Sequence, residues 1–276
     1  MRHLRAGGRN KSPLVPICIR LPVLFWVANN ANCPNVFSGC DIKPSDHSPP
    51  ATRVAGDASL SALRSLREAT RERHALLDRR MPLAGLAPGL REYRDHLRFL
   101  YAWLLPLEAW LAGFADGPQG PLAPSFVERL PLIEADMADP ATPPVEMPLA
   151  GTTRAWQGAL ESLAPAYRWG LCYVIEGSQL GGTVLYRRLA PALAPHPLRF
   201  LRGGMDGPVA PGPRWQAFLA ALEAQVRTSA DIALACRGAC DAFDRLLELL
   251  RENPALAAPA AEDALGTMKT ANQVAA

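Results

Sequence analysis

The chain has 276 residues, of which 49% are hydrophobic and 20% are charged, so it has enough apolar content for one or two domains with a real core. A formal net charge of +3, with 29 Lys and Arg residues spread along the chain, argues against a nucleic-acid-binding surface. We expect a soluble, cytoplasmic, globular protein with neither a nucleic acid nor a membrane as partner.

Residues 1–57 do not have the pattern of a folded domain, because Pro, Asn, Ser and Gly interrupt every short apolar run. Basic residues precede the apolar stretch 21–28, an order typical of a secretory signal peptide. However, Arg20 and Pro22 interrupt that stretch and no clean small-x-small cleavage site follows it. The stretch is also too short to span a membrane as a helix. We expect a disordered extension, or translation from a start codon upstream of the native one.

From residue 60 onward apolar residues recur every three or four positions, the period of amphipathic helices. The pattern predicts helices over residues 60–78, 90–114, 124–137, 153–163, 166–189 and 213–251. Pro106 should bend the second helix, and any break in the last is expected near Gly238. Since no alternating strand pattern of useful length follows, we predict an all-α fold, a single helical domain over residues 58–252 with six to eight helices. Residues 253–276 are expected to form a flexible tail.

The six cysteines do not have the spacing of a metal site. Three lie before residue 50 and three fall within helical patterns. A zinc site requires paired C-x-x-C or Cys/His spacing, whereas Cys236 and Cys240 form an i, i+4 pair on one helix. We expect buried free thiols.

His74 lies on the apolar stripe of the first predicted helix. It follows Thr70 by one turn and Leu66 by two, so its imidazole should face the interior. A satisfied core histidine is the more frequent interpretation of such a position, and a metal ligand is the alternative. Arg67 lies on the same face, roughly 10 Å back along the axis at about 1.5 Å per residue. Its guanidinium suits a carboxylate of a bound cofactor, with a solvated surface charge as the default alternative.

Three glycines interrupt the helix predicted over residues 166–189. Gly177, Gly181 and Gly182 should each cost about 1 kcal/mol relative to Ala, so another interaction must compensate. Gly177 and Gly181 are one turn apart on one face, where bare backbone can lie against a flat ligand. Close helix packing or a kink is the alternative, and the spacing alone favours packing.

Taken together, residues 66–74 (LREATRERH) and 176–182 (EGSQLGG) closely resemble the haem oxygenase family. The segments 93–101 (YRDHLRFLY) and 106–108 (PLE) add to the resemblance, which extends from about residue 60 to 251. In that family the first motif supplies the proximal histidine, and the second supplies the distal helix that lies over the haem. The resemblance therefore implies a haem-oxygenase-like helical bundle.

Carried over to this chain, the resemblance makes His74 the iron ligand. It assigns the backbone of Gly177, Gly181 and Gly182 to the distal side of the haem. Arg67 matches a position where many relatives have a basic partner for a haem propionate.

Ser178 is the main departure from the family pattern, since mammalian-type relatives have an aspartate directly after the first distal glycine. That carboxylate organises water near the bound oxygen, so in this chain Ser178 or Gln179 would have to support the water. The sequence Glu-Gly-Ser-x-Leu-Gly-Gly resembles the bacterial enzymes encoded with bacteriophytochromes, which indicates that branch of the family.

Three further residues are weaker candidates for the site. His96 lies close to the edge of the apolar stripe of the second helix and is the competing iron ligand. Tyr173 and Arg188 flank the glycine segment and are expected to touch the haem edge or the propionates. A solvated basic helix end is the alternative for Arg188.

The implied activity is O2-dependent opening of haem to biliverdin, with release of CO and Fe2+, which would supply a bacteriophytochrome with bilin or the cell with iron. Electrons must come from a separate partner such as a ferredoxin or a flavin reductase, because the chain has no Rossmann fingerprint, flavin motif or iron–sulfur cysteine run. A non-catalytic haem or bilin carrier that uses the same His74 pocket is the main alternative. A helical relative that binds another aromatic cofactor is the third hypothesis.

Overall fold

The computed structural model describes residues 61–258, apart from residues 126, 145–148, 153, 157–159 and 204–209. Over this part the chain forms seven α-helices and four short 3-10 turns, with no strand, so the predicted all-α fold is confirmed. The helices are α2 (Ala62–Arg80), α3 (Leu90–Leu111), α4 (Leu130–Met137), α5 (Pro165–Leu193), α6 (Arg199–Arg202), α7 (Pro211–Gln225) and α8 (Ser229–Glu252). The 3-10 turns are η1 (Pro82–Ala84), η2 (Gly117–Gln119), η3 (Leu160–Leu163) and η4 (Pro254–Leu256). The expected extension over residues 1–57 lies outside the described residues.

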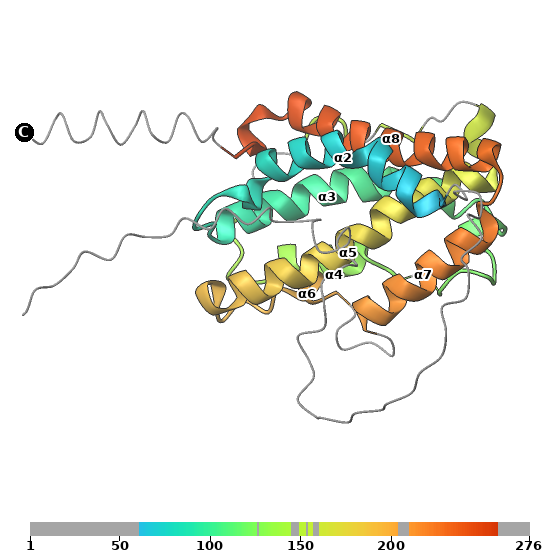
Figure 1. The fold of residues 1–276 in the computed structure, drawn as a ribbon. Coiled ribbons are helices and arrows are strands. Elements are labelled where there is room, and N and C mark those ends of the chain that lie inside the picture. Colours follow the sequence, from blue (N-terminus) through green and yellow to red (C-terminus); the bar gives the residue numbers. More distant parts are fainter. Residues whose placement is uncertain are drawn as a thin grey trace, which may run out of the picture.

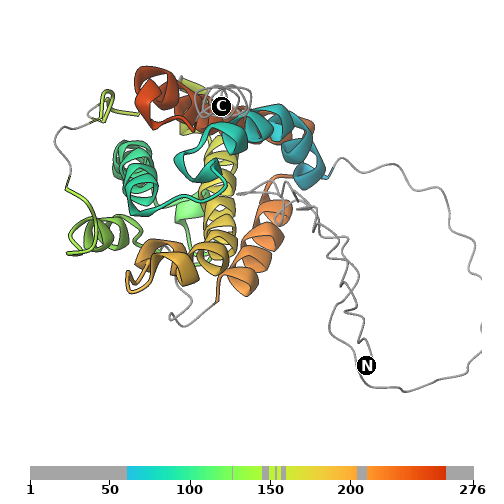
Figure 2. The same cartoon turned by 90° about the vertical axis from the view of Figure 1, so that its left-hand side faces the viewer.

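Helix α5 runs through the middle of the molecule, and the other helices surround it (Figures 1 and 2). It packs against α8, α7 and α6, while α3 and α4 pack on each other and close another side. Helix α2 lies on α8 (Figure 1). Large side chains that are almost fully buried fill the space between these helices, among them Trp103 of α3, Trp169 of α5 and Phe243 of α8.

Two glycines bring α5 and α8 into backbone contact. A Cβ atom at Gly170 of α5 would overlap the carbonyl group of Ala235, and one at Gly238 of α8 would overlap the carbonyl group of Tyr167. The prediction of a break near Gly238 is therefore wrong, since this glycine permits close packing within a continuous helix. The chain breaks instead at residues 226–228, where the Thr228 hydroxyl caps α8 by accepting a hydrogen bond from the Asp231 N–H at 3.1 Å.

Helix α8 also connects the two helices that carry the family motifs. Asp244 accepts two hydrogen bonds from Arg73 of α2, at 2.8 and 3.0 Å. One turn earlier, Asp241 accepts a hydrogen bond from the Tyr167 hydroxyl of α5 at 2.8 Å. Two carboxylates on one face of α8 thus fix α2 and α5 relative to the same helix.

Several predicted boundaries differ from the structure. No α-helix covers the described residues of 153–163: residues 154–156 are not helical and only the turn η3 follows. Helix α4 begins at Leu130 rather than at residue 124, with Pro131 in its first turn, where proline's missing N–H costs nothing. Helix α3 ends at Leu111, three residues before the predicted end. Helix α5 continues through Pro191 to Leu193, beyond the predicted end at residue 189.

Residues 253–258 lie beyond the predicted domain and nevertheless pack against it. Leu256 is buried in the core, and the Ala258 N–H donates a hydrogen bond to the Arg80 carbonyl oxygen at 3.1 Å. The Asn253 amide also reaches the backbone of Ala150 at 3.1 Å. The packed body therefore includes at least the first six residues of the segment expected to be a tail.

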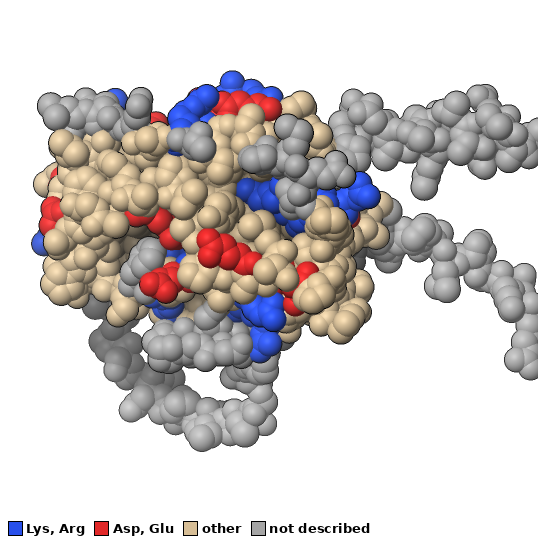
Figure 3. All heavy atoms as spheres, turned by 180° about the vertical axis from the view of Figure 1, so that it is seen from behind, with Lys and Arg blue, Asp and Glu red and all other residues tan. Residues whose placement is uncertain are grey.

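The surface mixes both signs of charge. On the face shown in Figure 3, Lys and Arg side chains form separate groups with Asp and Glu side chains between them. Among the helices that the structure describes, none combines the length and apolar character needed to cross a membrane.

Candidate functional site

The axes of α2 and α5 diverge toward their C-terminal ends, with α2 above and α5 running away beneath it (Figures 1 and 2). The motif residues lie along these two diverging helices. On α2, Arg67 and His74 are seven residues, or about two turns, apart on one face. On α5, Tyr173 and Gly177 are one turn apart, and Gly181 follows one turn later.

His74 is buried, with 8% of its surface exposed, and it faces the interior as the sequence predicted. Its Nδ1 lies 3.1 Å from the Oδ2 atom of Asp78, which is one turn further along α2 and equally buried. The imidazole also packs against the Phe243 ring of α8, at 5.8 Å between centroids. A carboxylate on Nδ1 is the usual arrangement of a metal-binding histidine, because it fixes the ring and makes Nε2 the coordinating nitrogen.

Arg67 and Tyr173 link the two helices where these are still close. Their side chains are hydrogen bonded to each other, with Arg67 half-buried and Tyr173 4% exposed. Burial raises the pKa of the Tyr173 hydroxyl to about 12, although Arg67 opposes this shift. The Tyr173 ring also packs on Trp215 of α7, at 5.5 Å between centroids. The structure therefore brings these two predicted site residues together.

The three glycines of α5 do not share one environment. Gly177 and Gly181 are buried, and their spacing of one turn puts them on one face of the helix. Gly182 lies about 100° further round. A Cβ atom there would be 3.5 Å from the Leu201 carbonyl oxygen, so this position faces α6. The bare-backbone face therefore consists of Gly177 and Gly181, with Gly182 beside it.

Ser178 and Gln179 are half-buried, and both side chains are directed elsewhere in this structure. The Ser178 hydroxyl donates a hydrogen bond to the Ile175 carbonyl oxygen of the preceding turn, at 2.7 Å. The Gln179 side-chain oxygen lies 2.7 Å from the place where a Cβ of Gly203 would be, after α6. Gln179 therefore lies on the side of α5 that faces away from Gly177 and Gly181.

The remaining candidates also have structural contacts. Arg188 donates a hydrogen bond to the Leu83 carbonyl oxygen of η1 at 2.7 Å, which ties the end of α5 to the turn that follows α2. His96 is 2% exposed within α3, and burial lowers its pKa to about 3, so its imidazole is neutral. His196 is not a candidate, and the structure agrees with that, because Nδ1 accepts a hydrogen bond from the Leu198 N–H and Nε2 contacts the Thr142 hydroxyl, each at 3.0 Å.

Two carboxylates escaped the sequence analysis. In the sequence, the only signal for Asp78 is that it is an acidic residue one turn after His74, at the i, i+4 spacing that allows contact on a helix. Glu176, directly before Gly177, belongs to the motif, but its partners Arg129 and Arg214 are 47 and 38 positions away in the chain. No periodicity connects such distant positions.

Among the predicted thiols, Cys172 is buried, whereas Cys236 and Cys240 are half-buried, and all three are free.

Comparison with known proteins agrees with the two motifs. The family model described as "Heme oxygenase" matches residues 60–252. A protein named "Heme oxygenase" from Xanthomonas campestris pv. campestris (strain 8004) is 30% identical over 155 residues, which cover 53% of this chain and 78% of that protein. No solved structure matches the chain. The family match covers most of the chain and nearly all of the packed body, and the chain therefore belongs to the haem oxygenase family.

Proposed function

We propose that this protein opens haem with O2 to biliverdin and releases CO and Fe2+. The observation that carries the proposal is a buried histidine held by a carboxylate on α2, together with the side-chain-free face of Gly177 and Gly181 on the diverging helix α5. These groups suit an iron porphyrin, because His74 would hold the iron and the glycine backbone would lie against the flat ring. The haem supplies the iron at which O2 is activated and the carbon ring that is opened.

On the proximal side, His74 would bind iron through Nε2, because Nδ1 faces Asp78. The carboxylate keeps the imidazole in one orientation and increases the basicity of Nε2. A neutral imidazole donates less electron density to iron than a cysteine thiolate does, which suits a reaction that consumes the porphyrin itself.

On the distal side, the backbone of Gly177 and Gly181 would lie against the ring, with Gly182 at its edge. Bare backbone would put no strong acid on this side of the ring. The Ser178 hydroxyl already donates to Ile175, so it would act as a hydrogen-bond acceptor for a water molecule rather than as an acid. Close contact along this helix would also shield part of the ring edge and thereby select the carbon that is opened.

Propionate recognition would rely on the basic residues near the two helices. Arg67 would exchange its hydrogen bond with Tyr173 for a bidentate contact with a carboxylate, since an arginine fork fits both oxygens. Tyr173 would then be free to contact the haem edge. Arg188, which is tied to Leu83 by its Nη2 atom, has other N–H groups for a second propionate.

Other components complete the proposed reaction. Electrons would come from a separate protein such as a ferredoxin or a flavin reductase. The product would supply bilin to a bacteriophytochrome, or the released iron would serve the cell, in the cytoplasm. We propose residues 58–252 as the catalytic domain, with residues 253–258 packed on it.

Turnover of the full-length protein tests the proposal against a haem or bilin carrier that uses the same His74 pocket. With haem, a reductant and O2, the protein should lose its Soret band and release a green pigment and CO. A Soret band that persists under these conditions would identify a carrier. A protein that binds no haem at all would favour a relative that uses another aromatic cofactor.

A further inference from the structure

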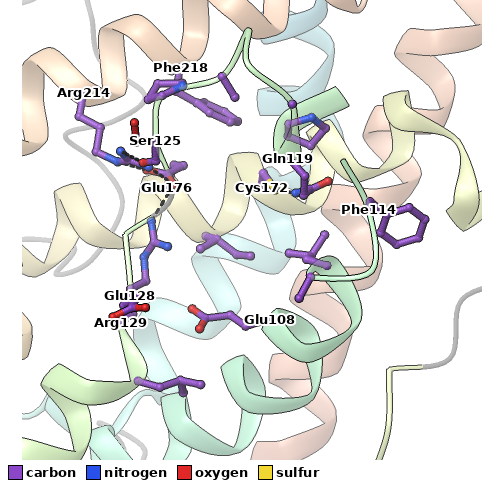
Figure 4. A pocket seen from close by; sticks show the side chains of 18 of the residues that line it. Glu108, Phe114, Gln119, Ser125, Glu128, Arg129, Cys172, Glu176, Arg214 and Phe218 are labelled. Carbon is purple, nitrogen blue, oxygen red and sulfur yellow. Dashed lines mark hydrogen bonds and ion pairs between the residues drawn. The ribbon is translucent and has the colours of Figure 1, made fainter. Parts of the chain in front are cut away.

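Glu176 is held by two arginines directly before the glycine face of α5. Its Oε1 atom lies 2.7 Å from Nη2 of Arg129 and 2.9 Å from Nη2 of Arg214, and its Oε2 atom lies 2.8 Å from Nε of Arg214 (Figure 4). Arg129 precedes α4 and is 1% exposed, and Arg214 belongs to the first turn of α7. The carboxylate therefore connects three separate elements.

The two arginines keep Glu176 ionised in a buried position. Its side chain is only 9% exposed. Burial alone would raise its pKa, but Arg129 and Arg214 outweigh burial and lower it. An ion pair of this kind has high geometric specificity, because the arginine forks accept only a narrow range of carboxylate positions.

A cavity adjoins this part of α5 on the side of Glu176. Glu176 lies in the wall of a cavity of about 770 Å³ that is also lined by Ile175, Arg129, Arg214 and Glu108 (Figure 4). Further along α5, Leu185 and Leu189 are buried among neighbouring side chains, as expected of a normal core helix. Next to the cavity, the ion pairs with Arg129 and Arg214 add to the apolar packing of Ile175, which is 2% exposed.

The segment that needs this support is intrinsically weak. Gly177, Gly181 and Gly182 each have a lower helix propensity than alanine. At about 100° of rotation per residue, Gly177 and Gly181 point more than 90° away from the direction of the Glu176 side chain, which borders the cavity. Because these residues belong to one continuous helix, a shift of Glu176 toward or away from Arg214 would carry the glycine backbone with it.

We propose that Glu176, held by Arg129 and Arg214, is a positioning residue that sets how closely the backbone of Gly177 and Gly181 approaches the haem and thereby which ring carbon is opened. This inference rests on the proposed function, because it assigns the regioselectivity of that reaction. Glu176 itself touches no substrate; it acts through the helix.

Two variants of the full-length protein test the inference, E176Q and R214Q, with their double variant. The R214Q variant keeps the ion pair between Glu176 and Arg129, so we expect it to fold even if E176Q does not. In the protein without haem, hydrogen–deuterium exchange at residues 177–182 should rise about tenfold in each variant, while exchange in α8 stays unchanged. With haem, the ratio of biliverdin isomers should shift about threefold or more. The double variant should match E176Q, because E176Q already removes the charge with which Arg214 pairs.

The matched control is D116N, which removes an ion pair to Arg168 near the start of the same helix, two turns before Glu176. It should leave both measurements at their wild-type values. Wild-type exchange and wild-type isomer ratios in E176Q and R214Q would overturn the inference. If the wild-type protein forms no biliverdin, the proposed function fails and the assignment of regioselectivity fails with it. The exchange measurement then still decides whether the two arginines hold the glycine segment.

Discussion

Asp78 lies one helical turn after His74, and its carboxylate lies beside Nδ1, which leaves Nε2 for the proposed iron. The sequence predicted the histidine, its burial and its face of the helix from apolar periodicity alone. It did not distinguish an iron ligand from a core histidine, because both have the same spacing. A carboxylate on His74 Nδ1 is compatible with both roles, because it orients a metal ligand and also satisfies a buried core histidine.

Replacement of Asp78 by Asn tests this role. The amide cannot supply the charge that increases the basicity of Nε2, so the affinity for haem should fall about 10-fold to 100-fold. A spectrophotometric haem titration measures the change. The control is Glu72→Gln, an exposed acidic residue on the same helix that should leave the affinity unaltered. Equal affinities in wild type and Asp78→Asn would show that the carboxylate has no part in haem binding.

Glu108, in the wall of the cavity beside Glu176, makes the stability depend on pH. Burial raises its pKa from the ordinary 4.5 to about 7, with a smaller opposing effect from Arg129 and a reinforcing one from Glu128. Between these values the folded protein binds more protons than the unfolded chain. The free energy of unfolding therefore decreases as pH rises through this window and levels off above it.

The variant Glu108→Gln removes this pH dependence. Its free energy of unfolding should exceed that of the wild type by about 1–2 kcal/mol at pH 8, a value reduced for solvent screening at the partly exposed side chain. Near pH 4 the two proteins should be equally stable, because Glu108 is then protonated in both states. Urea unfolding at both pH values gives the comparison, and a constant difference between the proteins would contradict the account.

At the level of elements, the period of 3.6 predicted the long helices α2, α3 and α5 within four residues at each end. The period did not predict where the last predicted helix breaks, because single residues decide this. A glycine in a helix is compatible with a break or with close packing, and only the partner helix decides between them. Gly238 faces the Tyr167 backbone of α5, so α8 continues through it, whereas Thr228 starts α8 with a side-chain cap that periodicity does not detect.

The crossing of α5 and α8 predicts a strong effect of one methyl group. Gly170→Ala would place its Cβ atom against the Ala235 carbonyl group. This group belongs to the backbone of α8, so it cannot move aside as a flexible side chain could. We expect a loss of about 3 kcal/mol or more in the free energy of unfolding, measured by denaturant titration. Gly212→Ala in the first turn of α7 is the control, because no atom lies within 4 Å of its added methyl group. A similar, small change in both variants would refute the close crossing.

For the whole molecule, the two motifs are about a hundred residues apart in the chain and are brought to one region by α8. Its Asp244 binds Arg73, directly before His74, and its Asp241 binds Tyr167, on the same helix as the glycines. The sequence predicted both motifs and their pairing through the family resemblance. It did not predict that α8 joins them, because the hydrogen bonds of Asp244 and Asp241 and the glycine contacts with α5 depend on single residues with no pattern of their own.

The most direct test of a haem held between α2 and α5 is the absorption spectrum of the haem complex of His74→Ala, with and without added imidazole. The account predicts that the spectrum of histidine-ligated haem is lost and that imidazole, which can occupy the vacated space beside Asp78, restores it. An unchanged spectrum in the variant would contradict the account and assign the iron to another residue, with His96 as the next candidate.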